Sequence, residues 1–149
     1  VQHEVFRVQI RLALERDLPI VIHTREADDD TFQILTEEGQ GRLRGVFHCF
    51  TGDAAAAERA LATGFFLSIP GVVTFPKAED LRKAVVAIPE DRLLIETDSP
   101  YLAPIPFRGK RNEPGHVARV VDQLAAVRGT TTATIGEQTD RNFERLFRP

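Results

Sequence analysis

The 149-residue chain contains no methionine and no tryptophan, and it has only one cysteine and one tyrosine. A single cysteine excludes an internal disulfide, and such sparse use is typical of the reducing cytoplasm, where we expect the protein to be. No stretch approaches the roughly 18 consecutive apolar residues of a membrane helix, so we expect no membrane partner. The formal net charge of −3 excludes a chain that coats nucleic acid through bulk positive charge alone.

The first residues already follow a helical pattern, although no initiator methionine precedes them. Phe6, Ile10 and Leu14 recur at helical spacing within residues 1–17. A sequence that begins inside a helix is typical of a fragment or a processed product. We therefore expect residues 1–149 to be part of a longer domain.

Strand patterns and helical patterns alternate along the rest of the chain. Short apolar runs predict strands at residues 18–23, 44–50, 65–69 and 92–97. Intervening periodic segments predict helices at residues 26–39 and 52–64 and a helix opened by Pro76. A loop at residues 98–112, which we expect to be ordered by packing, precedes two closing helices.

The predicted strands are apolar almost throughout, which indicates burial on both faces. Such strands are typical of a parallel sheet that is covered by helices. A flat doubly wound sheet and a barrel both fit this α/β pattern, but no strand is followed by the glycine-rich turn of nucleotide-binding sheets. Four strand–helix units would supply half of an eight-stranded TIM-like barrel.

Three of the four predicted strands end on a potential metal ligand. The residues are His23 in "VIHTRE", His48 in "VFHCFTG" and Asp98 in "IETDSP". The carboxyl ends of barrel strands meet at one rim, so we expect these side chains to converge there. Two imidazoles and a carboxylate suit zinc, manganese or nickel, and the carboxylate can also accept a proton from water.

Each of these residues also has a structural interpretation. A lone histidine at a strand end is more often a satisfied polar residue than a ligand, but the shared position of all three favours a metal site. Strand alternation predicts that Glu96 has a supporting role and that Cys49 is a buried structural thiol on the opposite side from His48. We expect His116 to lie on a helix surface.

Four basic residues could bind an anionic substrate at the same rim. Arg108, Lys110 and Arg111 lie within the loop segment "FRGKR", and Arg25 follows His23 by two positions. Phosphate is a suitable ligand for such a cluster. Pairing of these cations with Asp98, Glu96 or Glu113 is an equally good interpretation of the spacing.

With these motifs in place, the chain resembles the TatD family of metal-dependent deoxyribonucleases, within the amidohydrolase-type barrels. The resemblance covers nearly the whole chain. It depends on the segments "PIVIHTREA", "GVFHCFTG", "FFLSIPGVVTF", "RLLIETDSPYLAP" and "RGKRNEP". The combination of "FHCFTG" with "ETDSPYLAP" is specific.

The resemblance implies a TIM-like (β/α)₈ barrel that hydrolyses phosphodiester bonds in DNA with one or two divalent ions, such as Zn, Mg, Mn or Ni. It implies that His23 and His48 are metal ligands, and that Asp98 is both a ligand and the catalytic base. The family's early His-x-His pair and its glutamate ligand have no counterpart in this sequence. We therefore expect residues 1–149 to be a partial domain, the C-terminal half of the barrel.

Two other functions stay open. The first is a related barrel that acts on a non-nucleic ester, lactone or amide, and the second is an inactive fragment. The expected partners are DNA as substrate and, because a half-barrel leaves two strand edges unpaired, a second copy of the chain or a separate N-terminal half.

Overall fold

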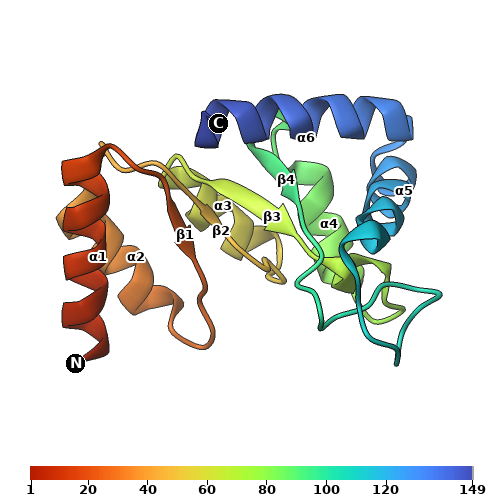
Figure 1. Cartoon of the computed structure of the whole chain (residues 1–149), viewed down its shortest axis with the longest axis horizontal. Helices are drawn as coiled ribbons and strands as arrows, with labels where there is room; N and C mark the ends of the chain where they lie inside the picture. Colours follow the sequence, from red (N-terminus) through yellow and green to blue (C-terminus); the bar gives the residue numbers. More distant parts are fainter. Residues whose placement is uncertain (149) are drawn as a thin grey trace.

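The computed structural model describes residues 1–148 and confirms an α/β fold in which parallel strands alternate with helices (Figure 1). None of the described helices has the length and apolar character that a membrane crossing requires. The elements in chain order are α1 (Gln2–Arg16), β1 (Ile20–Ile22), α2 (Asp28–Gly39), β2 (Gly45–Phe47), α3 (Ala54–Ala62), β3 (Phe66–Ile69), α4 (Glu79–Ala87), β4 (Leu93–Ile95), α5 (Val117–Arg128) and α6 (Thr132–Phe147), with short 3₁₀ turns at Gly71–Thr74, Glu90–Arg92 and Pro114–His116.

The four strands form one parallel sheet in the order β1-β2-β3-β4. Ile22 pairs with Phe47, Phe47 with Leu67, and Leu67 with Leu93. Strands in this register end together, so the residues that follow β1, β2 and β4 reach the same edge of the sheet. β1 and β4 are the outer strands.

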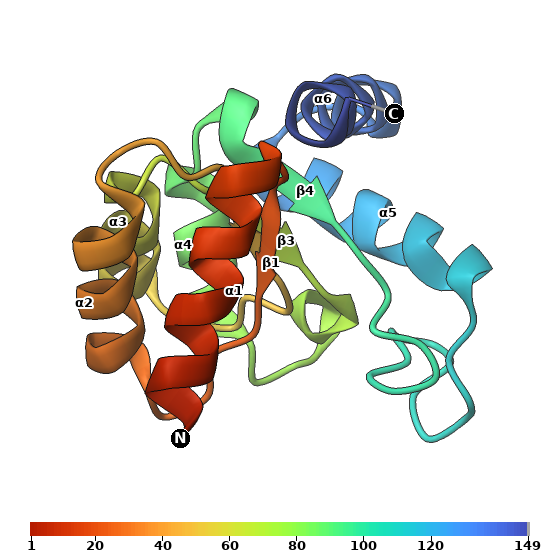
Figure 2. The same ribbon diagram turned by 60° about the vertical axis from the view of Figure 1, so that its left-hand side comes forward.

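The two faces of the sheet pack against different elements. One face presents the row that contains Ile22, Phe47 and Leu67, and it joins a large apolar cluster with residues of α1 to α5 and with Ile135 of α6. Figure 2 shows α6 apart from α1 and α2. The other face packs Val46, Phe66 and Leu94 against Leu146 of α6. β2 and β3 are therefore buried on both sides, whereas Val21 of the outer strand β1 is 58% exposed.

Some predicted boundaries are wrong by a few residues. α2 begins at Asp28, two residues later than predicted, and Gln40 takes the left-handed conformation after Gly39 ends the helix. Pro76 does not open a helix, since α4 begins at Glu79. The guanidinium of Arg82 instead donates hydrogen bonds to the Phe75 and Pro76 carbonyls, which holds this segment as a turn. The side chain of Asp53 caps α3, because it accepts a hydrogen bond from the Ala56 N–H.

A buried asparagine fixes α6 to the sheet. Asn142 is 3% exposed, and its amide group donates to the carbonyls of Glu90 and Leu93, both at 2.8 Å. The Glu90 carbonyl lies in the 3₁₀ turn that precedes β4, and the Leu93 carbonyl lies at the start of β4. The position of β4, and with it the residues that follow β4, therefore depends on this contact with α6.

Candidate metal centre

Three polar side chains meet where β1, β2 and β4 end. His23 and His48 each follow their strand directly, and their ring centroids lie 5.7 Å apart. The Nε2 atom of His48 lies 3.4 Å from Oδ1 of Asp98. The structure thus brings the three predicted ligands together from positions up to 75 residues apart, which is the separation of residues 23 and 98. Their role as ligands stays a prediction.

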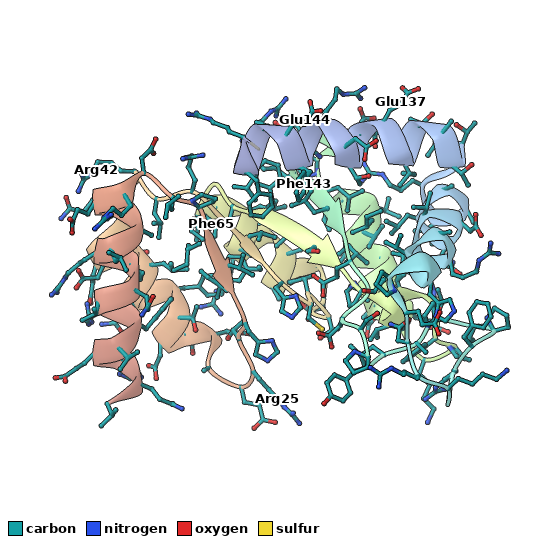
Figure 3. The ribbon with its side chains drawn as sticks, in the orientation of Figure 1. Arg25, Arg42, Phe65, Glu137, Phe143 and Glu144 are labelled. Carbon is teal, nitrogen blue, oxygen red and sulfur yellow. The ribbon has the colours of Figure 1, made fainter. Side chains whose placement is uncertain are left out.

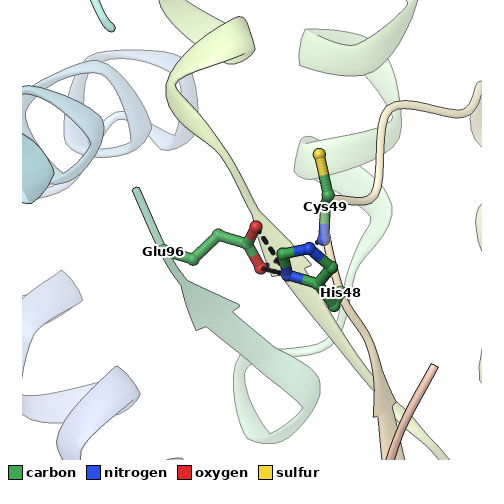
Figure 4. A group of neighbouring side chains, drawn as sticks. All are labelled: His48, Cys49 and Glu96. Carbon is green, nitrogen blue, oxygen red and sulfur yellow. Dashed lines mark hydrogen bonds and ion pairs between the residues drawn. The ribbon is translucent and has the colours of Figure 1, made fainter. Parts of the chain in front are cut away.

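The carboxylate of Glu96 holds the other side of the His48 ring (Figure 4). Its two oxygens lie 2.9 and 3.0 Å from Nδ1 of His48, and Oε2 also accepts a hydrogen bond of 3.0 Å from the Cys49 N–H. A carboxylate only accepts, so we assign the ring proton to Nδ1. Nε2 then presents a lone pair toward Asp98.

This arrangement fits a bound cation. In the neutral imidazole with its proton on Nδ1, a lone pair on Nε2 of His48 faces a carboxylate oxygen of Asp98, and a positive ion would relieve their repulsion. Two ligand atoms that are each about 2.1 Å from one tetrahedral ion are about 3.4 Å apart, which matches the observed separation. A histidine ligand whose second nitrogen donates to a carboxylate is also a recurring feature of metal sites.

Cys49 differs from its prediction. It is half-buried, and its Sγ lies in a group with a ring nitrogen of His48 and an oxygen of Glu96, all within 4.8 Å of one another. The residue has a φ of 53°, so simple strand alternation does not apply there. Burial, with the charges of Glu96 and Asp98, raises the pKa of the thiol to about 11.

The four predicted substrate-binding cations lie in two places. Arg25 lines a small cavity of about 220 Å³ beside His48. In Figure 3 Arg25 lies on the side of the molecule opposite to Glu144. The guanidinium of Arg108 lies 4.5 Å from the ring centroid of Phe75. Lys110 and Arg111 are exposed in the same loop. Within residues 1–148, none of the four forms an ion pair with Asp98, Glu96 or Glu113.

A buried asparagine that the sequence interpretation missed orders the loop after β4. Asn112 is 2% exposed, and its amide donates to the carbonyls of Thr97 and Tyr101 at 2.7 and 2.6 Å. Its Oδ1 lies 3.0 Å from Nδ1 of His116, whose ring stacks on Phe107 at 4.0 Å. His116 is therefore part of the loop structure rather than a free helix-surface residue, and hydrogen bonds as well as packing order the loop. In the sequence, only the position of this asparagine among the charged residues of "RGKRNEP" could have indicated that it orders the loop.

Histidines and acids at the carboxyl ends of helix-covered parallel strands define the class of metal-dependent hydrolases with an α/β fold. The sequence profile described as "TatD related DNase" matches residues 1–148, so the chain belongs to the TatD family. The family resemblance predicted from the sequence is thereby confirmed.

Curated relatives support the same class. The chain is 50% identical over 148 residues to "Uncharacterized metal-dependent hydrolase YabD" of Bacillus subtilis, covering 99% of this chain and 58% of that one. It is 46% identical to "Uncharacterized metal-dependent hydrolase YcfH" of Escherichia coli K12, covering 98% and 55%. It is 37% identical to "3'-5' ssDNA/RNA exonuclease TatD" of Pectobacterium carotovorum, covering 99% and 58%. The chain thus spans little more than half the length of these relatives.

Solved structures share the fold. The TatD homologue YJJV from Escherichia coli superposes with a TM-score of 0.87 at 31% identity, covering 95% of this chain and 54% of that one. A TatD family hydrolase from Entamoeba histolytica gives a TM-score of 0.84 at 21% identity, covering 95% and 55%, which shows the fold alone.

Proposed function

We propose that this chain carries part of the active site of a divalent-metal-dependent deoxyribonuclease that hydrolyses phosphodiester bonds. The observation that carries the proposal is the His48 imidazole, whose Nδ1 is held by Glu96 while its Nε2 faces Asp98 beside His23. The family description and the exonuclease name of the Pectobacterium relative support DNA as the substrate.

Each residue of the centre has a defined task in this proposal. His23, His48 and Asp98 would hold a divalent ion, which when bound supplies Lewis acidity to the phosphoryl oxygens. Asp98 accepts the proton of the attacking water through the oxygen that is not used as a ligand. Arg25, Arg108, Lys110 and Arg111 bind the anionic substrate, and Arg25, Lys110 and Arg111 stabilise the negative charge that grows in the transition state.

Asp98→Ala tests the assignment. In the metal-loaded protein, this variant should abolish cleavage of single-stranded DNA, measured on gels, while the circular dichroism spectrum stays unchanged. Asp140→Ala on the exposed face of α6 is the matched control and should cleave at the wild-type rate. Retained turnover in Asp98→Ala, or cleavage that resists removal of divalent ions by a chelator, would contradict the proposal.

The basic loop distinguishes DNA from a non-nucleic ester, lactone or amide. Each cation that contacts a single strand contributes about 0.7 to the slope of log affinity against log salt. Replacing Arg108, Lys110 and Arg111 by glutamine should therefore reduce that slope by about 2. An unchanged slope and unchanged activity would favour a substrate that is not a nucleic acid.

We also propose that residues 1–149 form a partial domain and that full activity requires further residues. Three side chains leave coordination positions of a divalent ion open. The outer strands β1 and β4 have a free edge each, which a second copy or a separate N-terminal half could pair. Sedimentation of the purified protein should show concentration-dependent self-association that Val21→Lys weakens, and a monomer at every concentration would exclude pairing with a second copy.

A further inference from the structure

A second cavity lies on the same rim as the candidate metal centre. It has a volume of about 600 Å³, and its lining includes Thr51 after β2, Phe75 after β3 and Arg108 after β4. Its volume falls in the range of ~300–1,000 Å³ that is typical of small-molecule sites. The three loops that build it lie at the ends of the strands (Figure 1).

Specific contacts fix the walls of this cavity. The Thr74 hydroxyl accepts a hydrogen bond of 2.9 Å from the Ile105 N–H, which ties the loop after β3 to the loop after β4. The same loops approach closely at Gly71, where an added Cβ would lie 2.4 Å from the Leu102 carbonyl oxygen. Arg82 holds the carbonyls of residues 73, 75 and 76. The cavity is therefore formed before any ligand enters it.

The lining combines an aromatic surface with unpaired positive charge. The exposed guanidinium of Arg108 stacks over Phe75, which leaves its outer face available for a second planar group. Lys77 is exposed on the lining, and within residues 1–148 neither cation forms an ion pair. The one acid of the lining, Asp80, is paired with Lys83 at 2.9 Å. The stacked Arg108–Phe75 pair complements a planar nucleobase, and the positive charge of Lys77 complements a phosphate joined to it.

The cavity is also close to the metal centre. Thr51 lines both this cavity and the smaller one that contains His48 and Arg25. Because Thr51 is three residues from His48, their Cα atoms are at most about 11 Å apart. A chain molecule that occupies one cavity can therefore extend into the other.

We propose that this cavity is a subsite for one nucleotide of single-stranded DNA, next to the phosphodiester that is cleaved. Its base stacks on the Arg108–Phe75 pair, and its phosphate lies near Lys77. The inference rests on the proposed function, and it adds a specificity determinant that acts on the part of the substrate away from the reacting phosphate. A duplex would hide its base faces and would not use the subsite.

Binding of a short fluorescent single-stranded oligodeoxynucleotide, measured by anisotropy in chelator, tests the subsite without hydrolysis. We expect Phe75→Leu and Arg108→Gln each to weaken binding about tenfold, as for loss of one base-stacking contact. The matched control is Arg59→Gln, which removes an arginine stacked at 4.6 Å on Phe32 in the helix layer and should bind like the wild type. Thermal melting confirms that each variant is folded.

A minimal substrate separates the two proposals. Metal-dependent hydrolysis of methyl 4-nitrophenyl phosphate, which has no nucleotide to reach the subsite, should be unchanged in Phe75→Leu. No oligonucleotide binding by the wild type, or equal binding by Phe75→Leu, Arg108→Gln and Arg59→Gln, would overturn the subsite. Absence of metal-dependent hydrolysis by the wild type would overturn the proposed function instead, while the binding comparison still decides the subsite.

Discussion

Glu96→Gln tests how the centre is organised, because it removes a charge without removing a side chain. In the structure the Glu96 carboxylate accepts from the His48 ring at 2.9–3.0 Å and from the Cys49 N–H at 3.0 Å. These contacts set the ring proton on Nδ1 and direct Nε2 toward Asp98. A glutamine keeps the size and one acceptor oxygen, but its amide donors can turn the imidazole to the wrong tautomer.

The expected loss of metal affinity in Glu96→Gln can be worked out from the change of the hydrogen-bond acceptor from a charged to a neutral group. A hydrogen bond to a charged group contributes about 1.5–3 kcal/mol and a neutral one about 0.5–1.5 kcal/mol, so losing the charge at Glu96 costs about 1–1.5 kcal/mol per bond. With two bonds affected, and about 1.4 kcal/mol for each factor of ten, affinity for a divalent ion should fall about 10- to 100-fold.

Isothermal titration with Mn²⁺ or Zn²⁺ measures this effect directly. Glu137→Gln on the exposed surface of α6 is the matched control and should leave affinity unchanged. Asp98→Asn should reduce affinity at least as much as Glu96→Gln, because it changes a predicted ligand. Equal metal affinity in wild type and Glu96→Gln would refute the positioning role that the structure indicates.

Two further predictions concern stability. Asn142→Ala removes the donor to two carbonyls and should lower the free energy of unfolding by about 2–4 kcal/mol in urea titrations. Asp140→Ala on the same helix should change that free energy by no more than about 0.5 kcal/mol. A similarly small change in Asn142→Ala would contradict the anchoring of β4 by α6. Hydrogen bonds from Arg11 and Arg7 lower the pKa of Glu38 from 4.5 to about 2, so its stabilising contribution is complete above pH 4.5 and is lost as the pH falls toward 2. Glu38→Gln should flatten the decline in unfolding free energy across that window, and an unchanged slope would show that the pairing does not stabilise the fold.

The sequence predicted the order of the elements because the strands are continuous apolar runs. In β2 and β3 both faces are buried, so Val46, Phe47, Phe66 and Leu67 give an unambiguous pattern. The strands are shorter than predicted, since the polar residues that end the apolar runs already belong to the rim. Pro76 misled the helix boundary because the contacts of Arg82 with this turn come from a residue six positions later.

The candidate site was only partly predictable. His23, His48 and Asp98 could be placed because each directly follows a strand or lies within a few residues of its end. Glu96 was predicted to have a supporting role, but its contact with His48 could not be read from the sequence. The side of Cys49 was predicted wrongly, because its φ of 53° breaks the alternation on which the prediction depended. Asn112 was missed for another reason: its hydrogen bonds with Thr97 and Tyr101 close a loop without any periodic pattern.

The central claim is that one divalent ion binds between the two imidazoles and Asp98. A crystal structure of the Mn²⁺-loaded protein, with anomalous data collected at the manganese edge, locates the ion directly. We expect a peak within coordination distance of His23, of Nε2 of His48 and of a carboxylate oxygen of Asp98. A peak on the Nδ1 side of His48, between Cys49 and Glu96, or one that contacts neither histidine, would contradict it.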